Sequence, residues 1–360
     1  MVRIKKSTIR EFEYQIEKKK VVCFGAGQDF QKLCEKYDIA KKLLYVVDNF
    51  NYGKSIMVGE ISIPVVSIED IGEEIKESIL VLSTIKYAQE ILEQLDKIKL
   101  LDNLNIYIPK VFENDDSEID FGLSGQEVIP KVIHYCWFGK GEMPKQFRDN
   151  IETWKKYCPD YEIRRWDENN YDIEKNRYMS QAYKAKKWGF VPDYARLDVI
   201  YNYGGIYLDT DVEILKPLDP LLELDLFCGF ENINFVNFGL GFGAKKNHEL
   251  IKKMMDVYEN LEFVKEDGSY NLTPSPKYQT MVLEAVGLKR NGCTQRIQND
   301  IILSSKYLAP VNLYGIGSPT EKSFSIHQYA ATWLNENQKR ENEQIENNYR
   351  YLINRMEKMQ

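Results

Sequence analysis

The stretch that decides the fold is "FVPDYARLDVIYNYGGIYLDTDVE", residues 190–213. Its second half places Asp209 and Asp211 two residues apart, directly after an apolar, strand-like run. Side chains alternate along a strand, so both carboxylates are expected on the same side of an extended segment. Carboxylates held close together repel each other unless a cation neutralises them, and hard divalent cations prefer oxygen ligands. The stretch is therefore compatible with a divalent metal site at a strand end and with a solvated strand end, and the acidic pair alone does not decide between them.

Strands and helices alternate on the amino-terminal side of this stretch. Apolar strand-like runs occur at residues 21–27, 43–49, 79–84 and 104–109, with helical patterns between them. This order predicts a small Rossmann-like domain with a parallel sheet over residues 1–118. A second cycle of strands and helices predicts another α/β domain over residues 119–335, in which residues 172–203 form a long helical region, 272–280 a Pro-rich loop, and 235–244 a strand. A highly charged helix is expected over residues 336–360.

Composition and charge narrow the functional class. The chain has 360 residues, a formal net charge of −7 and 29% charged residues, which argues against a general nucleic-acid binder. No apolar run approaches the length needed to span a bilayer. The six cysteines are scattered without a CxxC pair, as expected for reduced thiols. We expect a cytoplasmic protein without a transmembrane segment, able to associate peripherally with assembly machinery at the inner face of the cell membrane.

The neighbourhood of the acidic pair carries a longer pattern: an acid, an Arg three residues later, then Gly-Gly-x-Tyr-x-Asp-x-Asp. It resembles the sugar-nucleotide-binding region of glycosyltransferase family 32, the Och1-like and capsular-polysaccharide glycosyltransferases. It is also similar to the catalytic domains of the large clostridial glucosylating toxins. Two further blocks fit in the same order: "IPKVIHYCWFG" (129–139) resembles the family's first strand, and "SIHQYAATW" (325–333) resembles its closing block.

The resemblance implies a GT-A fold, a Rossmann-like mixed sheet with the DxD motif at a strand end. Asp211 would then bind Mn²⁺ or Mg²⁺ directly. Asp209 would contact the ribose or sugar of the donor and reach the metal through water. His327 would be the third metal-side ligand or a donor to the diphosphate, although a lone His is more often a satisfied core residue.

The first strand and the helix before the glycines supply the other implied donor contacts. Trp137 would stack on the nucleotide base, with the backbone around Cys136 and Phe138 reading the base edge; a core Trp is the alternative. Asp193 and Arg196 would hold sugar hydroxyls and the phosphate side, although their three-residue spacing also suits an ion pair on a helix surface.

The remaining implied contacts come from three separate places in the chain. Tyr207 would lie near the donor, and Asn237 would lie near the donor sugar. Trp333 would close over the phosphates, and Thr332 stands where the family has a Ser, so its hydroxyl is available but its role is open. The acceptor loop departs from the family's Gly-Pro, with Ser275 before the Pro, so the sequence says little about the acceptor.

The amino-terminal domain contains "FGAGQDF", which resembles a Gly-rich dinucleotide turn, and Asp48 follows it by about twenty residues. Phe30 occupies the third Gly position, so the fingerprint is incomplete. The region also resembles the small Rossmann-like modules attached to bacterial polysaccharide-biosynthesis enzymes. We expect a structural, regulatory or docking role for this domain.

These features together predict a metal-dependent retaining glycosyltransferase. It would move a sugar from a nucleotide-diphosphate sugar to a glycan or glycolipid acceptor in bacterial-type capsular or cell-surface polysaccharide synthesis. UDP is favoured over GDP as the nucleotide, although the sequence does not fix the base. Retention follows from the resemblance and from the lack of a spare base, although Glu213 and Glu231 stay candidates to reach the cleft. Two alternatives stay open: a sugar-nucleotide oxidoreductase or epimerase that uses the amino-terminal domain, and a non-catalytic carbohydrate-binding protein.

Overall fold

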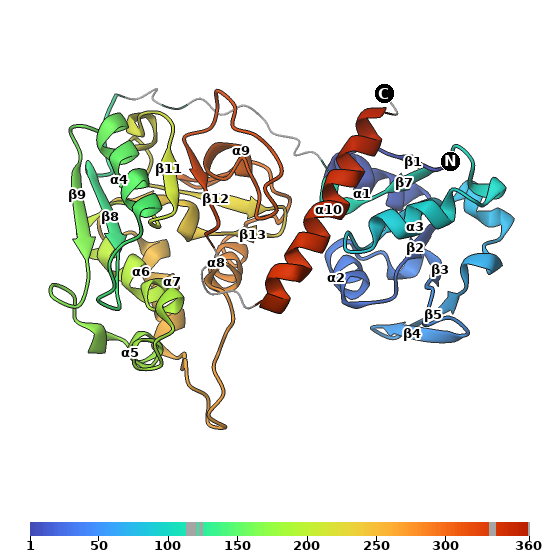
Figure 1. Ribbon diagram of the computed structural model, residues 1–360, viewed down its shortest axis with the longest axis horizontal. Helices are drawn as coiled ribbons and strands as arrows, with labels where there is room; N and C mark the ends of the chain where they lie inside the picture. Colours follow the sequence, from blue (N-terminus) through green and yellow to red (C-terminus); the bar gives the residue numbers. More distant parts are fainter. Residues whose placement is uncertain (113–120, 122–124, 331–335, 359–360) are drawn as a thin grey trace. The chain divides into compact units, whose positions relative to one another are not determined.

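The computed structural model describes residues 1–112, 121, 125–330 and 336–358. It divides into two compact units, each shown in Figure 1. Unit 1 comprises Met1–Asp115 and Leu334–Gln360, and unit 2 comprises Asp116–Trp333. The carboxy-terminal helix, expected as a separate segment, is therefore part of unit 1.

Unit 1 is built on a seven-stranded sheet in the order β1-β7-β6-β2-β3-β5-β4. Its strands are β1 (Arg3–Ile4), β2 (Val21–Phe24), β3 (Leu43–Val47), β4 (Lys54–Val58), β5 (Ile61–Val66), β6 (Ile79–Leu82) and β7 (Asn105–Tyr107). Every neighbouring pair is parallel except β4 with β5. The parallel Rossmann-like sheet is as expected, but the β4–β5 hairpin at its edge is an addition. Its two-residue turn contains Gly59 at φ +59°, a conformation that glycine adopts without strain.

Four long helices complete unit 1: α1 (Ile9–Lys18), α2 (Gln28–Tyr37), α3 (Ala88–Leu95) and α10 (Glu336–Lys358). Helix α3 packs four buried apolar side chains onto one face of the sheet, where Leu352 of α10 is also fully buried. Arg355 of α10 pairs with both carboxylate oxygens of Asp96, each at 2.8 Å. The last helix is therefore anchored in the core of unit 1 by both apolar and charged contacts.

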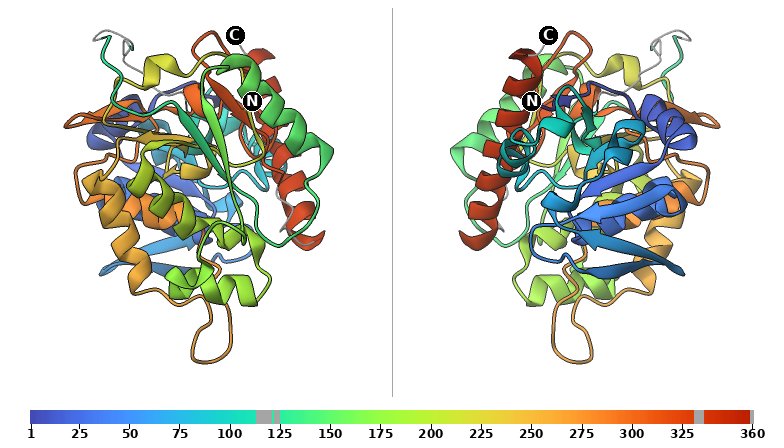
Figure 2. Two further views of the ribbon diagram at one scale, coloured as in Figure 1. Left: turned by 90° about the vertical axis from the view of Figure 1, so that its left-hand side faces the viewer. Right: turned by 90° about the vertical axis from the view of Figure 1, so that its right-hand side faces the viewer.

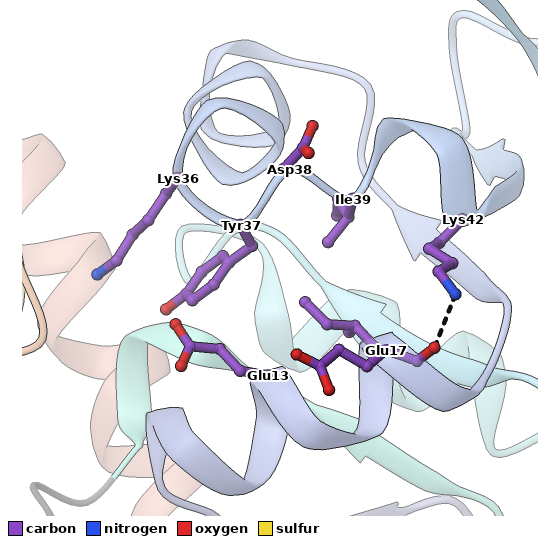
Figure 3. A pocket seen from close by; sticks show the side chains of 8 residues that line it. Glu13, Glu17, Lys36, Tyr37, Asp38, Ile39 and Lys42 are labelled. Atoms are coloured by element: carbon purple, nitrogen blue, oxygen red, sulfur yellow. Dashed lines mark hydrogen bonds between the residues drawn. The ribbon is translucent and has the colours of Figure 1, made fainter.

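A hollow of about 390 Å³ lies in unit 1 beside the carboxy-terminal ends of α1 and α2 (Figure 3). Acidic Glu13 and Glu17 line it from α1, and Lys42 lies opposite, donating to the carbonyl of Glu17 at 2.7 Å. Tyr37 points its hydroxyl toward Glu13. The lining offers charges of both signs, so the hollow does not select an ion of one sign.

Unit 2 contains a mixed sheet in the order β15-β16-β12-β14-β10-β8-β9, with β13 paired to β12. The strands are β8 (Val132–Cys136), β9 (Glu162–Trp166), β10 (Gly205–Tyr207), β12 (Leu226–Asn232), β13 (Phe235–Val236), β14 (Phe242–Ala244), β15 (Gln295–Ile297) and β16 (Asp300–Leu303). A separate ladder pairs β11 (Val212–Ile214) with β17 (Ser325–His327). Strands β9, β8, β10, β12 and β16 run parallel, so their carboxyl ends meet at one edge.

Helices cover both faces of this sheet. They are α4 (Lys145–Tyr157), α5 (Arg177–Lys184), α6 (Pro192–Tyr203), α7 (Glu249–Glu259), α8 (Ser275–Glu284) and α9 (Ser305–Leu308). Side chains alternate along β10, so Ile206 joins the core with α4 and α9, and Tyr207 joins the core with α6 and α7. The prediction of a Rossmann-like mixed sheet, with the DxD motif beyond a strand end, is confirmed.

Three local predictions for unit 2 were wrong. The region 172–203 breaks into α5 and α6, because Lys186 adopts φ +56° and Pro192 starts a new helix. The Pro-rich run becomes helix α8, with Pro276 in its first turn, the position where Pro needs no N–H partner. The run 235–244 forms two short strands around a 3₁₀ turn. The loop between α7 and α8 projects from the body of unit 2 (Figures 1 and 2).

Candidate metal and sugar-nucleotide site

The two DxD carboxylates lie in the turn between β10 and β11, at the carboxyl edge of the sheet. Val212 of β11 pairs with His327 of β17, which brings the closing block beside the motif. Asp209, Asp211 and His327 each offer a ligand atom, and these atoms lie within 4.8 Å of one another. The sequence predicted this trio from motifs more than a hundred residues apart, and the ladder explains how they meet.

Asp211 is held by the segment that follows β17. Its Oδ1 lies 3.2 Å from His327 Nε2, and its Oδ2 accepts from the backbone N–H of Ala330 at 3.1 Å. Burial pushes the pKa of Asp211 up, but the hydrogen bond and charge of His327 outweigh it, so the net direction is down. Asp211 is therefore an ionised carboxylate in the resting site.

The hydrogen bonds of His327 define its tautomer. Its Nδ1 accepts from the backbone N–H of Tyr329 at 3.2 Å, so the proton of the neutral ring is on Nε2, facing Asp211. Burial alone would lower the pKa of His327, but Asp211 raises it. Direct ligation through Nε2 requires this proton to leave and the bond from Tyr329 to be given up.

Arg196 on α6 bridges two carboxylates. Its Nη2 lies 3.3 Å from Asp193 Oδ1 and 3.5 Å from Asp209 Oδ1. Its guanidinium lies 5.1 Å from the ring centroid of Tyr207, whose hydroxyl donates to Asp209 at 2.9 Å. Asp193 and Arg196 are each only 4% exposed, so the alternative of a helix-surface ion pair is wrong.

The charge balance of the cluster fits a bound cation. Burial raises the pKa of Asp193 to about 7, although Arg196 opposes the rise. Burial also raises the pKa of Asp209. The positive charge of Arg196 partly opposes this rise, and the negative charge of Asp211 adds to it. Three carboxylates thus face one permanent cation, Arg196. The oxygen-rich set fits a hard divalent ion.

The turn before β14 forms a close wall against Asp209. Gly239 lies in it, and a Cβ there would stand 2.4 Å from Asp209 Oδ2 and 3.3 Å from Arg196 Nη1. Asn237 fixes the turn by accepting from the N–H of Gly239 at 2.7 Å. The structure thus brings Asn237 to the site through Gly239, a residue the sequence reading missed.

Helix α8 supports this wall with a buried polar face. Gln279 accepts from the N–H of Phe238 at 2.9 Å, and Thr280 accepts from the N–H of Val236 at 3.0 Å. A hydrogen bond from Ser275, at the start of α8, lowers the pKa of Asp193 against the larger effect of burial. The segment read as an acceptor loop is therefore structural support for the donor side.

Glu231 reaches the same edge from β12. A register shift between Phe230 and Asn232 places it at a β-bulge, a feature that redirects side chains near active sites. Burial raises its pKa, partly offset by His327 and by a hydrogen bond from Asn237. Glu231 is a further carboxylate near enough to His327 for the two groups to shift each other's pKa, whereas Glu213 lies on β11 and its carboxylate accepts from Gln328 Nε2 at 3.4 Å.

The residues after β8 lie at the same carboxyl edge. Trp137 is half-buried, donates its indole N–H to the carbonyl of Gly141 at 2.7 Å and packs edge-on against Phe147. Cys136 and Phe138 are buried in the core, and burial raises the pKa of the Cys136 thiol to about 12. Trp137 alone of these side chains keeps an exposed part for a ligand. Thr332 and Trp333, also predicted for the donor site, lie outside the described residues.

Asp48 is hydrogen-bonded to the Gly-rich turn of unit 1. Asp48 Oδ2 accepts from the N–H of Ala26 at 2.9 Å, and Oδ1 accepts from the N–H groups of Phe50 and Asn51, both at 2.9 Å. In a dinucleotide site this carboxylate would face ribose hydroxyls. In this structure backbone N–H groups donate to both carboxylate oxygens of Asp48, so the contacts of Asp48 stabilise the two turns.

Residues 144–227 match the model of the glycosyltransferase sugar-binding region containing a DXD motif. An uncharacterized glycosyltransferase of Acanthamoeba polyphaga mimivirus is 28% identical over 200 residues, covering 52% of this chain and 75% of the relative. Inositol phosphoceramide mannosyltransferase 1 of Schizosaccharomyces pombe is 30% identical over 172 residues, covering 44% of this chain and 49% of the relative. This chain thus spans about half the length of the yeast enzyme.

A solved structure, PaToxG glycosyltransferase, is 18% identical and covers 44% of this chain and 70% of its own, with a TM-score of 0.35. Within the described part of the chain, every helix is too short or too polar to cross a membrane.

The matched region contains Asp193, Arg196 and both DxD acids, the residues that the structure gathers at one edge of the sheet. The narrower resemblance to family 32 and to the toxins stays a prediction. The comparisons identify a glycosyltransferase with a DXD sugar-binding region.

Proposed function

We propose that unit 2 is a metal-dependent, retaining glycosyltransferase that uses a nucleotide-diphosphate sugar. The observation that carries this is the cluster of Asp209, Asp211 and His327 within 4.8 Å, beside a buried Arg196. A bound Mn²⁺ or Mg²⁺ would neutralise the acids and the charge on the leaving diphosphate. We propose Asp211 and Asp209 as its ligands, with His327 joining them if its proton moves to Nδ1.

The other residues hold and orient the donor in this proposal. Trp137 stacks on the base through its exposed part, while Cys136 and Phe138 set the backbone at the base edge. Asn237 and Tyr207 shape the sugar pocket around Asp209. Thr332 and Trp333 are proposed to close over the phosphates, on the strength of the sequence block alone.

We further propose that transfer retains the donor's anomeric configuration. The acceptor oxygen bonds to the anomeric carbon on the face from which the diphosphate departs. The bond between that carbon and the diphosphate oxygen breaks, and this oxygen takes the acceptor's proton. Arg196 lies beside Asp209, where it can hold the charge of the leaving group.

The proposed donor is a UDP- or GDP-linked sugar, and the proposed acceptor is a glycan or a glycolipid. The sequence favours a UDP-linked donor, and the mannosyltransferase name of the yeast relative adds GDP-mannose to the donors to be tested. That relative's name also specifies a ceramide-linked acceptor, in line with a glycolipid or glycan acceptor here. A place in capsular or cell-surface polysaccharide synthesis, near the inner face of the membrane, fits such an acceptor.

Donor hydrolysis tests the proposal. Wild-type protein is incubated with UDP-glucose, UDP-galactose and GDP-mannose, with and without Mn²⁺, and released nucleotide and sugar are measured. We expect metal-dependent release from one donor, and proton NMR should show a first-formed sugar with the donor's configuration. Asp211→Asn should lower turnover at least 100-fold without unfolding the protein, because a neutral amide is a far weaker ligand for a hard cation.

Other results would point elsewhere. Binding of nucleotide sugar without any turnover would favour the carbohydrate-binding alternative, and NAD binding would favour the oxidoreductase. Unchanged turnover of Asp211→Asn at low Mn²⁺ would contradict the metal assignment. An inverted first product would contradict the retaining route and direct attention to Glu231 as a base.

A further inference from the structure

Helix α4 holds the segment 210–214 through side-chain bonds to its backbone. Asn150 Nδ2 donates to the carbonyl of Thr210 at 3.0 Å, Trp154 Nε1 donates to the carbonyl of Val212 at 2.8 Å, and Thr153 Oγ1 accepts from the N–H of Ile214 at 3.0 Å. Thr210 is the residue between the two DxD acids. The bond from Asn150 therefore acts at the middle of the motif, and the other two act on β11 beyond it.

Asn150 also forms a reciprocal pair with Gln328. Its Nδ2 donates to Gln328 Oε1 at 3.2 Å, and Gln328 Nε2 donates to Asn150 Oδ1 at 3.1 Å. The backbone N–H of Gln328 donates in turn to the carbonyl of Asp211 at 2.9 Å. The pair thus joins three segments that are distant in sequence: α4, the DxD turn and the strand end that carries His327.

An amide pair in which one partner is buried and the other half-buried is a poor source of stability by itself, and Gln328 is the half-buried partner. Asn150 is 4% exposed, and Ile151 and Trp154 beside it on α4 belong to an apolar cluster. Buried amides need every hydrogen bond satisfied, and an apolar pair of the same shape is often as stable. A fully bonded polar pair at this place gives a defined geometry instead.

We propose that Asn150 and Gln328 are positioning residues that hold Asp209 and Asp211 toward one ion before it binds. This rests on the proposed metal-dependent transfer. The two carboxylates repel each other in the empty site, so an unrestrained turn would separate them. Part of the binding free energy would then be used to bring them back, which weakens the affinity for the ion.

Mn²⁺ affinity of the full chain tests the proposal, measured by electron paramagnetic resonance of the free ion alongside thermal unfolding. The double variant Asn150→Leu/Gln328→Leu keeps side-chain volume but removes the amides. We expect it to fold and to bind Mn²⁺ at least 10-fold more weakly. The exchanged pair Asn150→Gln/Gln328→Asn keeps two amides at the same combined length and should recover the affinity to within about threefold. Gln328→Ala gives the same test if the leucine pair does not fold.

Thr153→Val is the matched control, since it removes a bond from the same helix to β11 but none to the DxD turn. It should leave Mn²⁺ affinity within about twofold of wild type. Wild-type affinity in the folded leucine pair, or equal weakening by Thr153→Val, would overturn the positioning role while leaving the proposed function intact. A wild-type protein that binds no Mn²⁺ and hydrolyses no donor would overturn both.

Discussion

Gly239 shows how tightly the site is packed at the scale of one residue. Its φ lies outside the left-handed region, so the backbone accepts alanine, but the new Cβ would stand 2.4 Å from Asp209 Oδ2. Asp209 must then move away from Arg196. We expect Gly239→Ala to lower donor turnover at least 10-fold, with a stability cost of about 1–3 kcal/mol from overpacking.

Turnover and urea unfolding measured on the same preparation separate the two effects. Gly27→Ala is the matched control, because a Cβ at Gly27 in unit 1 meets no atom within 4 Å. It should leave turnover unchanged and cost about 1 kcal/mol of stability at most, because Gly27 is the N-cap residue of α2, where glycine is favoured over alanine. Normal turnover in Gly239→Ala would show that the position of the Asp209 carboxylate does not limit catalysis.

At the scale of an element, His134 joins strand β8 to its neighbours through two side-chain hydrogen bonds. The side chain is fully buried, its Nε2 donates to the carbonyl of Gly204 at 3.0 Å, and its Nδ1 accepts from Trp166 at 3.1 Å. Burial lowers the pKa of His134 to about 4, the largest effect on it. Between pH ~6.5 and 4 the unfolded chain therefore binds a proton that the folded chain does not. The contribution of His134 to stability is present at pH 7 and falls as the pH is lowered.

We expect this contribution to fall by about 2 kcal/mol between pH 7 and pH 5. It is measured as the difference in pH dependence of the unfolding free energy between wild type and His134→Asn, since the buried acids titrate in both proteins. The variant should be less stable at pH 7 but lose less on acidification. Parallel pH profiles for the two proteins would show that His134 is not a neutral, buried group.

At the scale of the whole molecule, the chain returns at its end to the unit in which it began. Leu352 of α10 is fully buried in unit 1, and Arg355 donates to the carbonyl of Val2 as well as to Asp96. We expect removal of residues 334–360 to destabilise unit 1 by about 3 kcal/mol or more, because it exposes this core and unpairs Asp96. Donor hydrolysis should persist, because the proposed site lies in unit 2.

Calorimetry of the full chain and the shortened chain measures the effect on each unit, and a donor assay measures the site. Leu352→Ala should give a smaller loss in the same transition, about 2 kcal/mol, whereas exposed Glu343→Ala should give none. Loss of hydrolysis in a shortened chain whose unit 2 stays folded would mean that unit 1 or α10 completes the site.

The sequence by itself determined the parts that depend on local pattern. Alternating strands and helices predicted the two α/β units. The DxD spacing and the resemblance of the block around His327 predicted that Asp209, Asp211 and His327 lie close together, as they do. The tertiary structure decided what local pattern does not encode. Whether Asp193 and Arg196 lie on a surface or in a core depends on what packs over α6. Here both are buried, and Arg196 lies between the carboxylates of Asp193 and Asp209. The sequence assigns no role to Gly239, Asn150 or Gln328, because their roles arise from atoms that other segments bring to them. Asp48 matched a ribose-binding pattern, yet its oxygens accept from backbone N–H groups of the Gly-rich turn and of its own turn. Chain periodicity fixes which elements form, whereas burial and long-range hydrogen bonds fix what each polar side chain contacts.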